Sequence, residues 1–196
     1  ILAVLIVLAA IALINVYPML AMKPLESGAI PGTGIITVKN SINNLYFLES
    51  EDEYLLIDAG TNATKVSGEM EQLGIAPEDV RLMLLTLSEY DQVGSLALFP
   101  VAIIYMSEDE GQMINGTTKR NAESSIALPE GVDTGGVIWL AEGQTLTLGG
   151  PIVECVKSPG HTPGSMSFLL DEAYLFTGEA FMLKGGELLV HPFTMD

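Results

Sequence analysis

Apolar and polar residues divide the chain into three parts. Residues 1–22 are almost continuously apolar, residues 23–34 are rich in Pro and Gly, and short apolar runs alternate with polar turns from residue 35 onward. An apolar helix of about twenty residues is long enough to span the hydrocarbon layer of a bilayer. The pattern therefore predicts a transmembrane or filament-core helix over residues 1–22, a linker over 23–34 and one folded domain over 35–196.

The folded part contains many short apolar runs bounded by turn residues, which is the pattern of short β-strands. Strands are predicted at residues 35–38, 45–48, 54–57, 81–87, 101–106, 137–140, 145–148, 152–156, 165–170 and 173–177. Helical segments are interleaved with these strands without a long βαβ series. This order favours a layered α/β or α+β sandwich over a doubly wound sheet.

Two helices are predicted by residue spacing. Three apolar residues between positions 66 and 73 recur at helical intervals, and Gly74 follows where a glycine commonly ends a helix. Ser107 and Glu110 have the spacing of a capping box, in which the two side chains cap the first turn of a helix. Residues 114–136 are rich in Asn, Thr, Gly and Ser and predict a long surface connection.

Charge excludes one class of partner. The chain has 25 acidic and 8 basic residues and a formal net charge of −17. So acidic a surface repels phosphate backbones, which argues against nucleic acid as a partner or a substrate. The single cysteine, Cys155, excludes an intrachain disulfide, and its place in an apolar strand predicts a buried side chain.

Candidate chemistry begins where the predicted strand at residues 81–87 ends. Glu89 and Asp91 follow that strand in a polar turn, and Gly94 then opens the next helical stretch. Carboxylates held at the end of a buried strand are a common way to build a metal or catalytic site.

This turn resembles the metal-binding signature of the metallo-β-lactamase superfamily, Thr-His-x-His-x-Asp-His-x-Gly. Residues 86–94 read Thr-Leu-Ser-Glu-Tyr-Asp-Gln-Val-Gly. Three further blocks resemble the family in the same order: Leu-Ile-Asp-Ala-Gly at 56–60, Ser-Pro-Gly-His-Thr-Pro-Gly-Ser at 158–165 and Leu-Phe-Thr-Gly-Glu-Ala at 175–180. The resemblance covers residues 35–196 and implies an αββα sandwich of two mixed sheets faced by helices.

The resemblance also implies that the domain is truncated at its C-terminal end. Family members usually continue with a further helix and a loop that carries the last metal histidine. His191 precedes the expected place of that loop and lies in a sequence typical of a surface loop. We therefore do not expect His191 to be a ligand.

The resemblance implies a depleted set of metal ligands. The three histidine places of the signature are taken by Leu87, Glu89 and Gln92, and only Asp91 matches the family. Leucine cannot bind a metal and glutamine is a poor ligand for zinc. The expectation is therefore that no cofactor is bound and that the family positions Leu87 and Gln92 are degenerate.

One arrangement with a metal is left open. The resemblance places His161 as the loop histidine, Glu179 where the family has a bridging aspartate, and Asp58 beside the ligands. A single divalent ion of iron, manganese or zinc would be held by Glu89, His161 and Glu179, with Asp91 alongside as the candidate catalytic residue. Carboxylate-rich sites suit iron or manganese better than zinc.

The favoured function is a non-catalytic one. The lost ligands and the apolar N-terminal segment predict a membrane-anchored domain that serves as an accessory or structural subunit, with lipid, other membrane subunits or further copies as partners. Two alternatives are open: a metal-dependent hydrolase with an atypical mononuclear site, and a pilin-like filament subunit. Asn-x-Thr triplets at Asn62 and Asn115 add slight support for a single N-terminal span with the domain outside the cytoplasm.

Overall fold

A computed structural model describes most of the predicted domain. The described residues are 24–50, 53–118, 134–147, 150–184, 186–191 and 195. The apolar segment predicted to span a membrane, residues 1–22, lies outside these ranges. Among the helices within them, none combines the length and apolar character needed to cross a bilayer.

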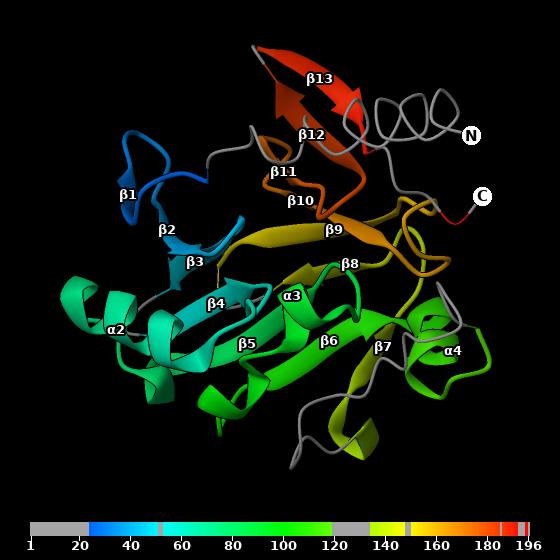
Figure 1. The fold of residues 1–196 in the computed structure, drawn as a ribbon, viewed down its shortest axis with the longest axis horizontal. Coiled ribbons are helices and arrows are strands. Elements are labelled where there is room, and N and C mark those ends of the chain that lie inside the picture. The colour runs from blue at the N-terminus through cyan, green and yellow to red at the C-terminus, as the bar shows by residue number, and fades with distance from the viewer. Residues whose placement is uncertain are drawn as a thin grey trace, which may run out of the picture.

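The larger of two main sheets has seven strands in the order of the sequence (Figure 1). Neighbours from β1 to β4 pair antiparallel, and those from β4 to β7 pair parallel, so this sheet is mixed. Its strands are β1 (Gly28–Ile30), β2 (Ile35–Asn40), β3 (Asn43–Ser50), β4 (Glu53–Ile57), β5 (Val80–Leu85), β6 (Ile103–Ser107) and β7 (Ile138–Leu140).

The second sheet faces the first and has four strands in the order β11-β10-β9-β8. Its described pairings are all antiparallel, whereas the resemblance implied a mixed sheet. A separate antiparallel hairpin, β12 with β13, stands apart from both main sheets in Figure 1. These strands are β8 (Thr145–Thr147), β9 (Ile152–Lys157), β10 (Met166–Leu170), β11 (Tyr174–Phe176), β12 (Phe181–Lys184) and β13 (Glu187–Val190).

Helix α2 confirms the helix predicted from spacing. It begins after Asn62, whose side chain accepts a hydrogen bond from the backbone of Lys65, and it ends at Gly74 in the left-handed conformation. The other helices are short. The helices are α2 (Ala63–Leu73), α3 (Tyr90–Val93), α4 (Gly111–Ile114), and the 3₁₀ turns η1 (Pro77–Asp79), η2 (Leu96–Leu98), η3 (Glu108–Glu110) and η4 (Thr134–Gly136).

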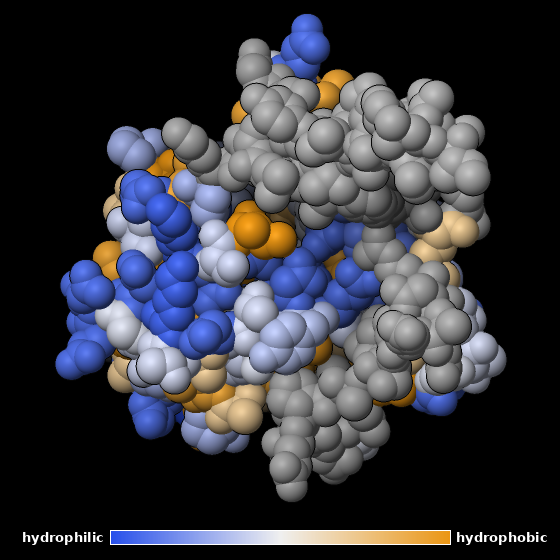
Figure 2. Space-filling view, viewed as in Figure 1, coloured by the Kyte–Doolittle hydropathy of each residue, from blue (hydrophilic) through white to orange (hydrophobic). Residues whose placement is uncertain are grey.

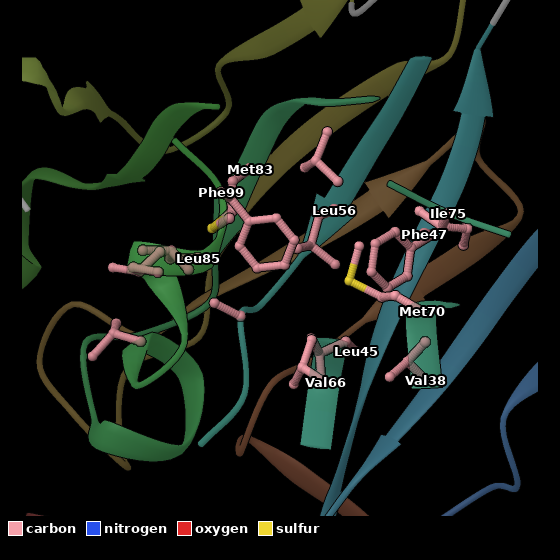
Figure 3. Close-up of a cluster of buried hydrophobic side chains, with 14 of the residues drawn as sticks. Val38, Leu45, Phe47, Leu56, Val66, Met70, Ile75, Met83, Leu85 and Phe99 are labelled. Atoms are coloured by element: carbon pink, nitrogen blue, oxygen red, sulfur yellow. The ribbon is translucent and has the colours of Figure 1, made fainter. Parts of the chain in front are cut away.

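Alternate residues of the central strands enter two different cores, as the two-residue repeat of a strand requires. Leu56 of β4 belongs to the cluster that includes Val66 and Met70 of α2 (Figure 3). Its neighbour Leu55 belongs to the cluster between the two sheets, with Phe168 of β10. The larger sheet is thus covered on both faces, which explains why β4 and β5 read as almost continuous apolar runs.

Figure 2 shows hydrophilic side chains in a broad band across the described part of one face of the molecule. Cys155, predicted to be buried, has no exposed surface.

Two predictions about the ends of the domain are wrong. Residues 28–30, within the predicted linker 23–34, form β1 and pair with β2. The segment around His191, interpreted as a surface loop, follows directly on β13 of the hairpin. β1 is a short strand at the edge of the larger sheet, and β13 lies outside both main sheets. Neither therefore has the alternation of apolar and polar residues that burial imposes on inner strands.

The predicted capping box at Ser107 and Glu110 is also wrong. Neither η3 nor α4 has a side-chain hydrogen bond at its N-terminus. The carboxylate of Glu110 instead accepts hydrogen bonds from Ser88 and Thr162, two residues of other loops. A tertiary contact has therefore replaced the local one that the spacing suggested.

Packing between the sheets gives a first prediction. Leu84 of β5 is fully buried in the cluster between the two sheets. Leu84→Ala is expected to lower the free energy of unfolding by about 2–5 kcal/mol, because it removes buried methyl groups and leaves a cavity. Leu175→Ala is the matched control, since Leu175 is 53% exposed, and it should cost no more than about 0.5 kcal/mol. Urea denaturation measures both, and equal losses would contradict the assignment of Leu84 to the core.

Candidate metal and active site

Four segments bring polar side chains together beside the ends of strands. Glu89 lies between β5 and α3, His161 in the loop from β9 to β10, Glu179 after β11, and His191 immediately after β13. The contact between Glu89 and His161 joins residues that are 72 positions apart in the chain. The two main sheets and the hairpin thus each contribute to one site.

A buried aspartate shapes the end of β5. Asp58 has a left-handed backbone, with φ of 58°. Its Oδ1 accepts hydrogen bonds from the backbone N–H and the hydroxyl of Thr86, at 2.9 and 3.0 Å. Gly178 lies against the same threonine, because a Cβ added there would lie 2.5 Å from Thr86 Oγ1. The contact therefore requires glycine and places Glu179 next to the end of β5.

Helix α3 is held in place by backbone hydrogen bonds. The N–H of Ala59 donates to the carbonyl of Gln92 at 2.7 Å, and the N–H of Ser95 donates to the carbonyl of Gly60 at 3.0 Å. The side-chain amide of Asn43 donates to the carbonyl of Asp91 at 2.8 Å. Although α3 is a single turn, these contacts fix the side chains that it presents to the site.

His161 lies at the centre of the site and is buried. Its Nε2 is 2.8 Å from Glu179 Oε2 and 3.0 Å from Glu89 Oε2. The ring of His191 packs edge-on against it, with ring centroids 4.8 Å apart, and His191 Nε2 is 3.8 Å from Glu179 Oε2. On the other side, Gln92 Nε2 donates to Glu179 Oε1 at 3.2 Å.

The side chains form two sets of potential ligands. The imidazole set is His161, Glu179 and His191, and the carboxylate set is Glu89, Asp91 and Glu179; within each set, one ligand atom per residue lies within 4.8 Å of the others. Glu179 belongs to both sets. Among the described residues, the lysine and arginine ion pairs lie elsewhere, for example Lys157 with Asp109.

Burial and hydrogen bonding shift the pKa values of the central pair. Burial alone would lower the pKa of His161, but its hydrogen bonds to Glu179 and Glu89 and their negative charges outweigh this and raise it to about 9. Burial would raise the pKa of Glu179, but hydrogen bonds from His161, Asp91 and Gln92 bring it well below its usual range. In the metal-free protein the two side chains therefore form a buried ion pair.

The remaining carboxylates hold their protons more tightly. Burial, followed by a hydrogen bond to Glu179 and its charge, raises the pKa of Asp91. Burial also raises the pKa of Asp58 to about 7, although its hydrogen bonds from Thr86 oppose the shift. Protons thus take up part of the negative charge that a cation would otherwise neutralise.

The donor atoms fit a divalent cation. Two imidazoles with a glutamate are a ligand set used by catalytic zinc, whereas a purely carboxylate set suits harder ions such as manganese or magnesium. The side-chain amide oxygen of Gln92, Oε1, is buried and has no hydrogen-bond partner among the described residues. A buried acceptor without a donor, beside Glu179, is consistent with a site that binds a further cation or hydrogen-bond donor.

The structure brings together the residues predicted from the sequence. Glu89, Asp91, His161 and Glu179 all lie in the two sets, and Asp58 lies behind them through Thr86. Leu87 is buried and 1% exposed, as expected of a residue that packs at the end of a strand.

One site residue was missed. His191 was not expected to contribute, yet it is 6% exposed and lies in the imidazole set. The signal that was available is the strand-like run Glu187–Val190 immediately before it, because a histidine at a strand end near other strand ends is a candidate for the same site.

Comparison with known proteins identifies the family. The profile of the metallo-beta-lactamase superfamily matches residues 39–192. The uncharacterized protein YobT of Bacillus subtilis is 34% identical over 153 residues, which cover 73% of this chain and 64% of YobT. The chain belongs to the metallo-beta-lactamase superfamily.

Two further relatives carry descriptions of activity. A probable polyketide biosynthesis zinc-dependent hydrolase of Bacillus velezensis, BaeB, is 28% identical over 139 residues, covering 69% of this chain and 53% of BaeB. A solved metallo-beta-lactamase of Cronobacter sakazakii with a HARLDQ motif superposes with a TM-score of 0.61 at 25% identity, covering 76% of this chain and 59% of that one. That motif ends in Asp-Gln, as does the segment Leu87–Gln92 of this chain. The chain spans less than two thirds of the length of YobT and of BaeB.

These findings confirm the mixed α/β fold of metallo-beta-lactamase type and correct two predictions. The favoured function, a non-catalytic accessory or structural subunit, is contradicted by relatives that are named as hydrolases. The expectation of no cofactor is contradicted by the zinc dependence stated for BaeB and by the ligand sets of the structure. Both errors came from counting missing histidines without knowing where the remaining donors lie.

The shifted pKa of His161 gives a second prediction. Its value rises from 6.5 in an ordinary environment to about 9 in the folded protein, so the stabilisation is complete below pH 6.5 and is lost as the pH rises to 9. The metal-free protein should therefore become less stable between pH 7 and 9. Asp91, whose pKa is also raised, acts in the same direction, and Glu179 remains ionised throughout this range.

Chemical denaturation in the presence of a chelator, at several pH values between 7 and 9, measures this dependence. The His161→Gln variant should show a smaller loss of stability over the same range, because its side chain does not titrate. Parallel curves for the wild-type protein and the variant would contradict the buried ion pair of His161 with Glu179.

Proposed function

We propose that the protein is a metal-dependent hydrolase whose cation is held around Glu179. The observation that supports this most directly is the convergence of two histidines and three carboxylates in two ligand sets that share this one side chain. Relatives named as zinc-dependent and metallo-beta-lactamase enzymes agree with it. The proposal replaces the accessory role that the sequence first suggested.

In this proposal the imidazole set holds the principal cation. His161 and His191 would offer Nε2 atoms and Glu179 an oxygen, while the carboxylate set is the place for a second, harder ion. A bound divalent ion of this kind lowers the pKa of a water ligand towards neutrality and polarises a substrate carbonyl. The excess of negative charge on Glu89, Asp91 and Glu179 accounts for why a cation is favoured at all.

The protein's own residues prepare the site for hydrolysis. Glu179 accepts hydrogen bonds from His161 and Gln92, so its carboxylate cannot rotate freely. With the cation in the imidazole set, the Asp91 carboxyl beside Glu179 is the group placed to take up a proton and pass it to a leaving group. Tyr90, between Glu89 and Asp91 in the chain, is 65% exposed and offers an aromatic surface to a substrate beside them.

The charge of the chain limits the class of substrate. The chain's net charge of −17 disfavours polyanionic substrates such as nucleic acids. We therefore propose small acyl substrates, namely esters, thioesters, lactones or β-lactams. Anchoring through residues 1–22, with the domain outside the cytoplasm, stays a prediction from the sequence alone.

Metal binding supplies the third prediction. The protein, stripped with a chelator and titrated with Zn²⁺ or Mn²⁺ in a calorimeter, should bind at least one ion per chain. Glu179→Gln should weaken binding by about 100-fold or more, because it removes a ligand shared by both sets, and His191→Ala should weaken it by at least about 10-fold. Glu172→Gln, which removes the same charge from an exposed turn, should leave the affinity unchanged. Equal affinities for the Glu179 and Glu172 variants would contradict the site.

Activity supplies the fourth prediction. The metal-loaded protein is expected to hydrolyse at least one substrate in a panel of a thioester, a lactone, an aryl ester and a chromogenic β-lactam. Asp91→Asn should lower kcat by about 10²-fold or more, because it removes the carboxyl that exchanges a proton. Glu172→Gln again serves as the control. Stoichiometric metal without turnover of any member of the panel would contradict the hydrolase assignment while leaving the metal site intact.

A further inference from the structure

Glu110 is a fully buried acidic residue outside both ligand sets. It is the last residue of η3 and has 0% of its surface exposed. Buried carboxylates are costly unless hydrogen-bond donors satisfy them. The donors that satisfy Glu110 come from the two loops that carry the site.

The first loop is the one that follows β5. Glu110 Oε1 accepts a hydrogen bond from the backbone N–H of Ser88 at 3.0 Å and another from its hydroxyl at 2.8 Å. Ser88 immediately precedes Glu89. Two hydrogen bonds to one residue fix both its backbone and its side chain, and so fix the point from which Glu89 extends towards His161.

The second loop is the one between β9 and β10. Glu110 Oε2 accepts a hydrogen bond from the hydroxyl of Thr162 at 2.8 Å, and Thr162 immediately follows His161. The Thr162 hydroxyl also lies 2.8 Å from Ser165 Oγ, which in turn accepts a hydrogen bond from the Thr162 N–H at 3.0 Å. The loop is thereby closed on itself and tied to Glu110.

The same loop is pressed against the backbone of Glu110. A Cβ at Gly164 would overlap the backbone nitrogen and the carboxylate of Glu110. Only glycine therefore permits this approach. The carboxylate thus bridges two loops that no described backbone ladder joins at this point, although the adjacent Met166 N–H donates to the Thr86 carbonyl at 2.8 Å.

We infer that Glu110 is a positioning residue that holds Glu89 and His161 at their observed separation. Its hydrogen bonds go to Ser88 and Thr162, the chain neighbours of the two site residues, and it acts through them. The effect of Glu110 on metal binding rests on the proposed function, but the effect of Glu110 on the two loops does not.

The hydrogen-bond pattern predicts which substitution is tolerated. In Glu110→Gln the amide oxygen can still accept from Ser88, and the amide N–H₂ can donate to Thr162 Oγ1. The Thr162 hydroxyl then turns to donate to Ser165 Oγ, which is possible because either of these two hydroxyls can be the donor. Glu110→Ala leaves the buried N–H and hydroxyl of Ser88 without an acceptor.

The fifth prediction compares these variants by Co²⁺ binding to the full chain. Glu110→Ala should weaken Co²⁺ binding by about 10- to 100-fold and alter the visible absorption of the bound ion, as removal of a group that orients metal ligands does. Glu110→Gln should stay within about 3-fold of the wild type. Met113→Ala is the control, because it empties a buried position in the adjacent α4 and should lower stability without changing the spectrum.

Amide hydrogen exchange of the metal-free protein tests the role of Glu110 independently of metal binding. In Glu110→Ala the amides of Ser88 and Thr162 should exchange faster relative to those of β4 and β5, whereas in Met113→Ala all of them should change together. If Glu110→Ala does not fold, Thr162→Val removes one of the same hydrogen bonds and should produce the same selective change at Thr162 and a weaker effect on Co²⁺ affinity.

The outcomes separate the inference from the proposed function. Unchanged Co²⁺ affinity and spectrum in a folded Glu110→Ala protein would overturn the role of Glu110 and leave the metal site standing. Absence of Co²⁺ binding by the wild type would refute the proposed function. The hydrogen-exchange data alone would then decide whether Glu110 positions the two loops. Selective loss of protection at Ser88 and Thr162 supports the inference, and uniform loss overturns it.

Discussion

The carboxylate of Glu179 belongs to both sets of potential ligands, and its surroundings set the main electrostatic constraint on the site. Three carboxylates lie within 4.8 Å of one another through one oxygen each. Carboxylates at this distance repel unless protons or a cation share their charge. In the metal-free protein, the protonated ring of His161 offsets part of this charge, and the raised pKa of Asp91 lets its carboxyl keep a proton. A divalent ion can replace both protons.

Because these carboxylates repel one another, the surrounding structure must hold their positions. Buried hydrogen bonds provide this support at the ends of the strands. Asp58 holds Thr86 at the end of β5, and Glu110 holds Ser88 and Thr162. These contacts lie directly behind the ligand sets, so the carboxylates cannot move apart without leaving buried donors unsatisfied. The two cores on either face of the larger sheet make the strand ends themselves rigid.

The sequence was informative where local chemistry decides the structure. The inner strands and α2 with its terminal Gly74 follow from burial pattern and backbone preference, and four motif blocks in order indicated the family. It was uninformative where a tertiary contact decides. The acidic residue three positions after Ser107 looked like a helix cap but lies between two distant loops, and the hairpin β12–β13, with Leu183 and Leu188 exposed, carries no pattern of burial. His191 was missed because its strand was missed.

The functional error has a similar physical origin. A list of ligand positions treats each lost histidine as a lost bond, but the capacity of a site for a cation depends on which donor atoms converge in space. Leu87 does not offer a donor, yet His191 reaches Glu179 from a different element, and Glu89 brings an oxygen within 3.0 Å of the His161 ring. Replacing an imidazole by a carboxylate also adds negative charge, which increases the attraction for a cation. Glu89, in place of the family's histidine, is therefore expected to change which metal is preferred and not to abolish metal binding.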